Sequence, residues 1–138
     1  MADEIQTGNT AHLAVSDAAA RIQGADTVRS IPLFRHGTLL VKYYAPRGND
    51  PQTPHTRDEL YVVAQGRGIF FDGISRRPFV PGDLLFAAAG TAHRFEEFTN
   101  DFGVWVMFYG PENGEADQPP ARPDTSPAAL ARSPLGAG

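Results

Sequence analysis

Residues 54–66, PHTRDELYVVAQG, place a histidine and a carboxylate directly before a β-branched and aromatic run. On one straight strand His55 and Glu59 would lie ~13 Å apart, at ~3.3 Å per residue. A helix would bring them together, but Pro51 and Pro54 precede the segment and the β-rich run follows at once. We therefore predict a bend over residues 56–58, with His55 ending one strand and Glu59 opening the next.

A second stretch, residues 81–93 (PGDLLFAAAGTAH), ends on another histidine. Gly90-Thr91-Ala92 is typical of a turn, so we expect His93 to arrive from a third strand. Two imidazoles and one carboxylate around an ion leave coordination positions open, which suits catalysis better than a structural role. The sequence predicts one divalent metal ion on His55, Glu59 and His93, with Fe²⁺ favoured and Zn, Mn or Ni as alternatives. The competing interpretation is a barrel without metal, in which these groups are polar core residues.

The segments around these two stretches indicate an all-β domain. Between residues 31 and 110, apolar and aromatic runs of four to eight residues alternate with Gly, Pro, Asn and Asp. Many short strands with closely spaced turns are typical of a sandwich or barrel. Asp72-Gly73 is a hairpin signal.

On these residues the chain resembles the cupin superfamily, over roughly residues 31–110. The family's first motif maps onto Gly48, His55, Glu59 and Gly66, and its second onto Gly82, Ala88, Gly90, His93 and Glu97. The resemblance implies a single-domain, cupin-type double-stranded β-helix, or jelly-roll barrel.

Three positions depart from the family pattern. Ala88 replaces a proline and Glu97 replaces an asparagine, while Thr53 stands where the first metal histidine usually lies. The resemblance therefore implies two histidines and one glutamate in place of three and one. Thr53 could bind the ion weakly or hold a water, and Gln52 could substitute if the local register shifts by one.

Both ends of the chain differ from the barrel in composition. We assign residues 1–30 to an N-terminal extension with a short amphipathic helix over residues 11–23, stopped by Gly24. Residues 111–138 hold half of the twelve prolines and no aromatic residue. We interpret this segment as a flexible tail, because it offers too little apolar surface to offset its ordering entropy.

Composition excludes several classes of site. The 138 residues include no cysteine, so disulfides, Fe–S clusters and thiolate zinc sites are ruled out. The net charge of −4 argues against a nucleic-acid binder, which usually carries a basic stripe. The N-terminus lacks the features of a secretory signal and no apolar run is long enough to span a bilayer, so we expect a cytoplasmic protein without membrane contact.

Alternation along the strands predicts the surroundings of the ion. Tyr61 and Val63 share the face of Glu59, and Phe95 shares that of His93, so these side chains would line the cavity. Tyr61 is our candidate for a catalytic acid or base. His12 and His36 lie in a helix start and a turn, where we expect no ligand role.

The cupin resemblance implies a broad range of activities. We favour a metal-dependent enzyme, resembling a dioxygenase or oxidoreductase, that acts on a small organic molecule. The alternatives are a non-catalytic small-molecule-binding cupin and a metal-dependent isomerase or lyase. A metal-free sugar-nucleotide epimerase ranks last, because no basic cluster lies beside His55. Exposed strand edges favour a homodimer.

Overall fold

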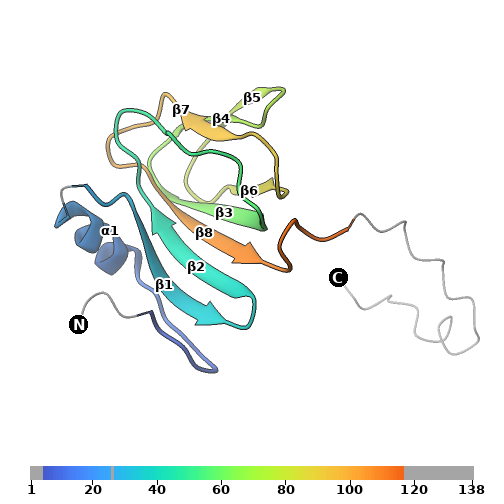
Figure 1. The fold of residues 1–138 in the computed structure, drawn as a ribbon. Coiled ribbons are helices and arrows are strands. Elements are labelled where there is room, and N and C mark those ends of the chain that lie inside the picture. The colour runs from blue at the N-terminus through green and yellow to red at the C-terminus, as the bar shows by residue number, and fades with distance from the viewer. Residues whose placement is uncertain (1–4, 26, 117–138) are drawn as a thin grey trace, which may run out of the picture.

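Two antiparallel sheets and one short helix form the part of the chain that the computed structural model describes, residues 5–25 and 27–116 (Figure 1). The five-stranded sheet has the order β1-β2-β8-β3-β6 and the three-stranded sheet the order β5-β4-β7. The larger sheet contains β1 (Ser30–His36), β2 (Leu39–Tyr44), β3 (Asp58–Gln65), β6 (Leu84–Ala87) and β8 (Gly103–Tyr109). The smaller sheet contains β4 (Gly68–Phe71), β5 (Arg76–Phe79) and β7 (Arg94–Glu96). The all-β architecture predicted from the alternating runs is confirmed.

The core lies between the sheets and is built largely from aromatic rings. On β3, Tyr61 and Val63 pair with Val106 and Val104 of β8, so the apolar side chains of both strands cover one face. Four phenylalanines fill the space toward the smaller sheet, with ring centroids 4.8 to 5.6 Å apart in the contacting pairs: Phe70, Phe79, Phe95 and Phe102. This rigid layer positions β3 and β7, which lead to the candidate site.

Helix α1 (Val15–Gln23) covers the other face of the larger sheet (Figure 1). Its buried residues Ala18 and Ile22 belong to a second core with Ile31, Leu33 and Tyr43. Gly24 caps the helix, as predicted, and donates its N–H to the Ala20 carbonyl at 3.0 Å. The helix begins four residues later than the predicted range, because the backbone up to Ala14 is extended. No helix in the described residues is long and apolar enough to cross a membrane.

The hairpin predicted at Asp72-Gly73 joins β4 to β5 through a four-residue loop, since Phe71 pairs with Arg76. Both oxygens of Asp72 are used within the loop: Oδ1 accepts N–H groups from Ile74 and Ser75, at 2.9 and 2.8 Å, and Oδ2 accepts from the Ser75 hydroxyl. These bonds favour the carboxylate and hold the pKa of Asp72 well below its usual range. The loop thus fixes the register of the smaller sheet.

Gly66, which closes the first motif, ends β3 with a φ of +83°. A Cβ at this position would lie 2.5 Å from the Phe102 Cα, so a larger residue would collide with backbone. The glycine is required both by its left-handed conformation and by this close approach.

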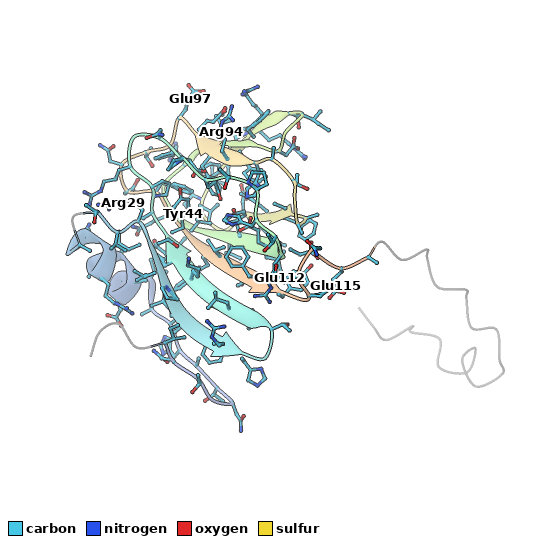
Figure 2. All side chains as sticks on the ribbon, viewed as in Figure 1. Arg29, Tyr44, Arg94, Glu97, Glu112 and Glu115 are labelled. Atoms are coloured by element: carbon cyan, nitrogen blue, oxygen red, sulfur yellow. The ribbon has the colours of Figure 1, made fainter. Side chains whose placement is uncertain are left out.

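The first residues of the proline-rich segment that we assigned to a tail are hydrogen-bonded to the segment before and at the start of β3. The Asn113 N–H donates to the Thr56 carbonyl at 2.6 Å, and the Glu115 N–H donates to the Asp58 carboxylate at 2.8 Å. Figure 2 shows Glu112 and Glu115 beyond the end of β8. Residues 117–138 lie outside the described residues.

Candidate metal centre

His55, Glu59 and His93 converge at one point at the end of the barrel interior. One nitrogen of each imidazole and one carboxylate oxygen all lie within 4.8 Å of one another. Nε2 of His93 lies 2.8 Å from Oε1 of Glu59, and Nε2 of His55 lies 3.8 Å from the same oxygen. Ligands with bonds of about 2.0–2.2 Å to one ion are separated by distances of this order. The structure thus brings together the three residues selected from the sequence.

The three side chains come from different kinds of structure. Glu59 is the second residue of β3, and His93 directly precedes β7 after the predicted turn. The prediction that His55 ends a strand is wrong: β2 ends at Tyr44, and residues 45–57 contain no strand. Proline and glycine interrupt this segment, so its backbone cannot join a ladder. The His55 backbone is instead fixed by its carbonyl, which accepts the Gly90 N–H at 2.8 Å.

The orientation of His93 leaves a lone pair directed toward the site. Its Nδ1 lies 2.7 Å from the Thr91 carbonyl, an acceptor, so Nδ1 carries the proton. In the neutral imidazole Nε2 is then unprotonated, which is the form that ligates metals. Burial lowers the pKa of His93, but the adjacent Glu59 carboxylate, the Thr91 carbonyl and the negative charge of Asp50 outweigh it, and the net pKa is raised. Protons therefore compete with a cation for this nitrogen.

Glu59 is a buried carboxylate without hydrogen bonds. Its exposed fraction is 1%, and neither oxygen has a hydrogen-bond partner in the described residues. Nε2 of His93 lies 2.8 Å from Oε1, and this contact is an ion pair only when the imidazole is protonated. An ionised carboxylate in such a place is costly unless a cation compensates it. The donor set and its orphaned oxygens fit a divalent ion.

A loop aspartate connects the two histidine-bearing segments. Asp50 is 7% exposed and accepts the Phe95 N–H at 2.8 Å, the Gln52 side-chain amide at 2.5 Å, and the hydroxyl of Tyr44, whose position on β2 Figure 2 shows. Phe95 lies two residues beyond His93, and Gln52 lies three residues before His55. Asp50 thereby joins the loop to β7.

Gln52 and Tyr61 face the candidate site, whereas Thr53 does not. Oε1 of Gln52 lies 3.2 Å from Nε2 of His55 and 3.2 Å from the Tyr61 hydroxyl, which also lies 2.8 Å from Nε2 of His93. Burial, followed by the negative charge of Glu59, raises the pKa of Tyr61 well above its ordinary value. Thr53 is exposed, so of the two residues considered for a fourth ligand only Gln52 presents an oxygen.

A cavity of about 190 Å³ opens beside two of the three candidate ligands, His55 and Glu59. His55, Glu59 and Tyr61 line it together with Lys42, Tyr44 and Gln52. Val63 and Phe95, which we expected at the cavity wall, lie instead in the aromatic core. Val63 lies four residues beyond Glu59, and Phe95 lies two residues beyond His93. Both are therefore further along their strands than the cavity extends.

Two residues of this region were missed by sequence reasoning. Asp50 follows Gly48-Asn49, so it has the appearance of an ordinary turn residue. Lys42 is the single charged residue in the run Leu39–Tyr44, and a lysine inside an apolar strand was the available signal. Asp58, the first residue of β3, accepts N–H groups from Ala89 and Glu115, each at 2.8 Å.

Comparison with known proteins supports the fold. No protein-family model matches the sequence. The uncharacterized protein SCO3923 of Streptomyces coelicolor is 36% identical over 64 residues, which make up 46% of this chain and 61% of that protein. The chain thus spans less than two thirds of this curated relative.

Among solved structures, the protein BH2720 of Bacillus halodurans superposes with a TM-score of 0.60 at 17% identity, covering 75% of this chain and 83% of that one. A Cupin 2 conserved barrel domain protein of Salinispora arenicola gives a TM-score of 0.56 at 19% identity, covering 74% of this chain and 91% of that one. A structure of the DMSP lyases RdDddP and RnDddQII gives 0.51 at 22% identity, covering 60% of this chain and 47% of that one. The chain has the cupin fold, as the two motifs predicted.

Proposed function

We propose that this protein is a metal-dependent cupin that binds one divalent ion through His55, Glu59 and His93. The observation that carries the proposal is the Glu59 carboxylate, buried and without hydrogen bonds between two imidazoles. Gln52 is the nearest additional oxygen and would complete the ligand set or hold a water. When bound, the ion would act as a Lewis acid and as a template for substrate.

We favour Fe²⁺ and an oxygen-dependent oxidation or cleavage of a small organic molecule. Two imidazoles and one carboxylate with open positions suit this metal, although Zn, Mn and Ni accept the same donors. The cavity of about 190 Å³ limits the substrate to a small compound. Tyr61, with its hydroxyl 2.8 Å from Nε2 of His93, is positioned to hold or move a proton at the cavity wall.

A lyase or isomerase is the second candidate activity. The cupin fold is shared with the DMSP lyases named above, which supports this class by fold alone. A raised pKa keeps the Tyr61 hydroxyl protonated at neutral pH, so it would serve as a donor in either chemistry. A binding protein without turnover would use the same cavity.

Metal analysis separates these candidates. Untagged protein, purified without added metal, should contain near-stoichiometric iron that His93→Ala loses and His36→Ala retains. Iron would justify an oxygen-uptake screen on small carbonyl and phenolic compounds. Zinc, nickel or manganese would favour the lyase or isomerase, and absence of metal after reconstitution would remove the enzyme proposal.

We also propose that the protein forms a homodimer through the edge of its larger sheet. β6 is an edge strand, and its residues Leu84 and Phe86 are 65% and 51% exposed. Edge strands with exposed apolar side chains are commonly covered by a second chain. Light scattering should give twice the monomer mass, and Phe86→Lys should restore the monomer.

A further inference from the structure

Lys42 lines the same cavity as the candidate metal ligands His55 and Glu59. It lies in the middle of β2, where it pairs with Val106 of β8, and Val106 pairs in turn with Tyr61 of β3. The three residues form one row across the sheet, so their side chains emerge on the same face. Adjacent strands are about 4.8 Å apart, which separates the Lys42 and Tyr61 backbones by about 10 Å. The cavity lies along this row and is lined by both residues.

The ammonium has no partner of its own. Within the described residues no hydrogen bond or ion pair holds Lys42, although a half-buried charge is normally paired. Burial lowers its pKa from the ordinary value, while the negative charge of Glu59 opposes that change. If Glu59 ligates a cation, its charge is already compensated, and Lys42 is left without a counter-charge.

A count of formal charges around the cavity gives the sign of the charge expected on a bound molecule. A divalent ion on one carboxylate and two neutral imidazoles leaves one positive charge, and Lys42 adds a second. Asp50, which accepts four hydrogen bonds from Tyr44, Gln52 and Phe95, contributes one negative charge nearby. The remaining positive charge would be neutralised by a single negative charge on a bound molecule.

The structure assigns Lys42 the role of a carboxylate anchor, and the substrate of this cavity is a small monocarboxylate. This inference rests on the proposed function, because it places the acid group at Lys42 and leaves the other end of the molecule for the metal ligands. A monocarboxylate fits better than a phosphate ester, since Lys42 is the single lysine or arginine at the cavity wall and phosphates usually bind several donors. A volume of about 190 Å³ also favours a compound smaller than a nucleotide.

Matched acids and amides test the charge directly. The probes are 3-hydroxypropionate, 4-oxopentanoate and 3-phenylpropionate, each compared with its neutral amide, and inorganic phosphate. Affinities are measured by calorimetry on metal-loaded and metal-free protein. At least one acid should bind about tenfold or more tightly than its amide, as expected for a charge-assisted hydrogen bond in a half-buried site.

Two variants locate the effect. Lys42→Met should bring the acid-to-amide ratio close to one, while Lys42→Arg should retain most of the preference. Metal content should stay unchanged in both variants, since Lys42 is not a ligand, and neither variant should melt below the wild type, since Lys42 forms no hydrogen bond or ion pair within the described residues. An unchanged ratio in Lys42→Met would overturn the inference, as would equal binding of all acids and amides or binding of phosphate alone.

The metal-free measurement separates this inference from the proposed function. If the protein takes up no metal but still prefers acids through Lys42, the inference about Lys42 holds and the proposed metal-dependent function is refuted. If the protein binds metal through His55 and His93 but shows no preference for acids, the metal site holds and the inference about Lys42 is refuted.

Discussion

Replacing Glu59 by glutamine should stabilise the metal-free protein and abolish its stabilisation by metal. The wild-type carboxylate is 1% exposed and has no hydrogen bond, so metal-free protein bears the cost of a desolvated charge. An unsatisfied buried polar group costs about 1–3 kcal/mol, and more when it is charged. The amide of Gln is neutral and removes the buried charge beside Nε2 of His93, which lies 2.8 Å from Oε1. We expect Glu59→Gln to raise the free energy of unfolding of metal-free protein by about 1–3 kcal/mol.

Saturating metal should reverse the order of stability of the wild type and Glu59→Gln. A ligand at a hundred times its Kd stabilises the native state by about 2.7 kcal/mol. For a domain of this size about 1 kcal/mol corresponds to a few degrees in Tm, so both effects are measurable by scanning fluorimetry. The wild type should melt below Glu59→Gln in chelator and above it in saturating metal. The measurement is made at about pH 8.5, about two units above the ordinary imidazole pKa near 6.5, because the pKa of His93 is raised.

The control is Glu97→Gln, the same substitution at an exposed carboxylate. It should change the unfolding free energy by less than about 0.5 kcal/mol and leave the metal response intact. A lower Tm of metal-free Glu59→Gln would show that the carboxylate is satisfied within the protein. An equal metal response in wild type and variant would show that Glu59 is not a ligand. Either result refutes the argument for this site.

Three further predictions concern the surroundings of the site. Metal should be released as the pH falls through the raised pKa of His93, because only the neutral imidazole ligates; full retention at about pH 4, measured by elemental analysis after dialysis, would contradict this. Asp50→Ala should weaken metal binding by about 10- to 100-fold, since it frees the loop from Phe95; an unchanged affinity in a competition titration would exclude this role. Glu97 has a φ of +48°, where asparagine is better tolerated, so Glu97→Asn should raise the unfolding free energy by about 0.5–1 kcal/mol; a lower denaturant midpoint would disprove that strain.

The three residues of the candidate site could be selected from the sequence because their chemistry and their neighbours agree. His55 and Glu59 precede a β-rich run, and His93 follows a turn, so the spacing alone required a bend on one side and a new strand on the other. The buried face of β3 followed from strict alternation, since a one-residue shift would expose Tyr61 and Val63. The asparagine that the motif has at position 97 also has a physical reason, because the backbone there is left-handed and tolerates asparagine better than the Glu97 of this chain.

The conformation of the loop between β2 and β3 could not be predicted from the sequence. Its conformation depends on long-range bonds from Asp50 to Phe95 and from His55 to Gly90, which no local pattern encodes. Thr53 occupies the family's histidine position, yet it points outward because the loop has no strand to fix alternation. Lys42 was seen as part of a strand, but whether it faced the helix or the cavity depended on which face of the larger sheet α1 covers.

The two hydrogen bonds that the Asp58 carboxylate accepts limit how far the chain can be shortened at its C-terminal end. The carboxylate is 4% exposed and binds N–H groups from the loop before β7 and from Glu115, and Gly114 leaves no room for a Cβ beside it. A recombinant fragment that stops after β8 would keep all strands of the described residues yet remove one of these donors from a buried acid next to Glu59. A minimal expressible domain therefore has to include Glu115, six residues beyond the end of β8.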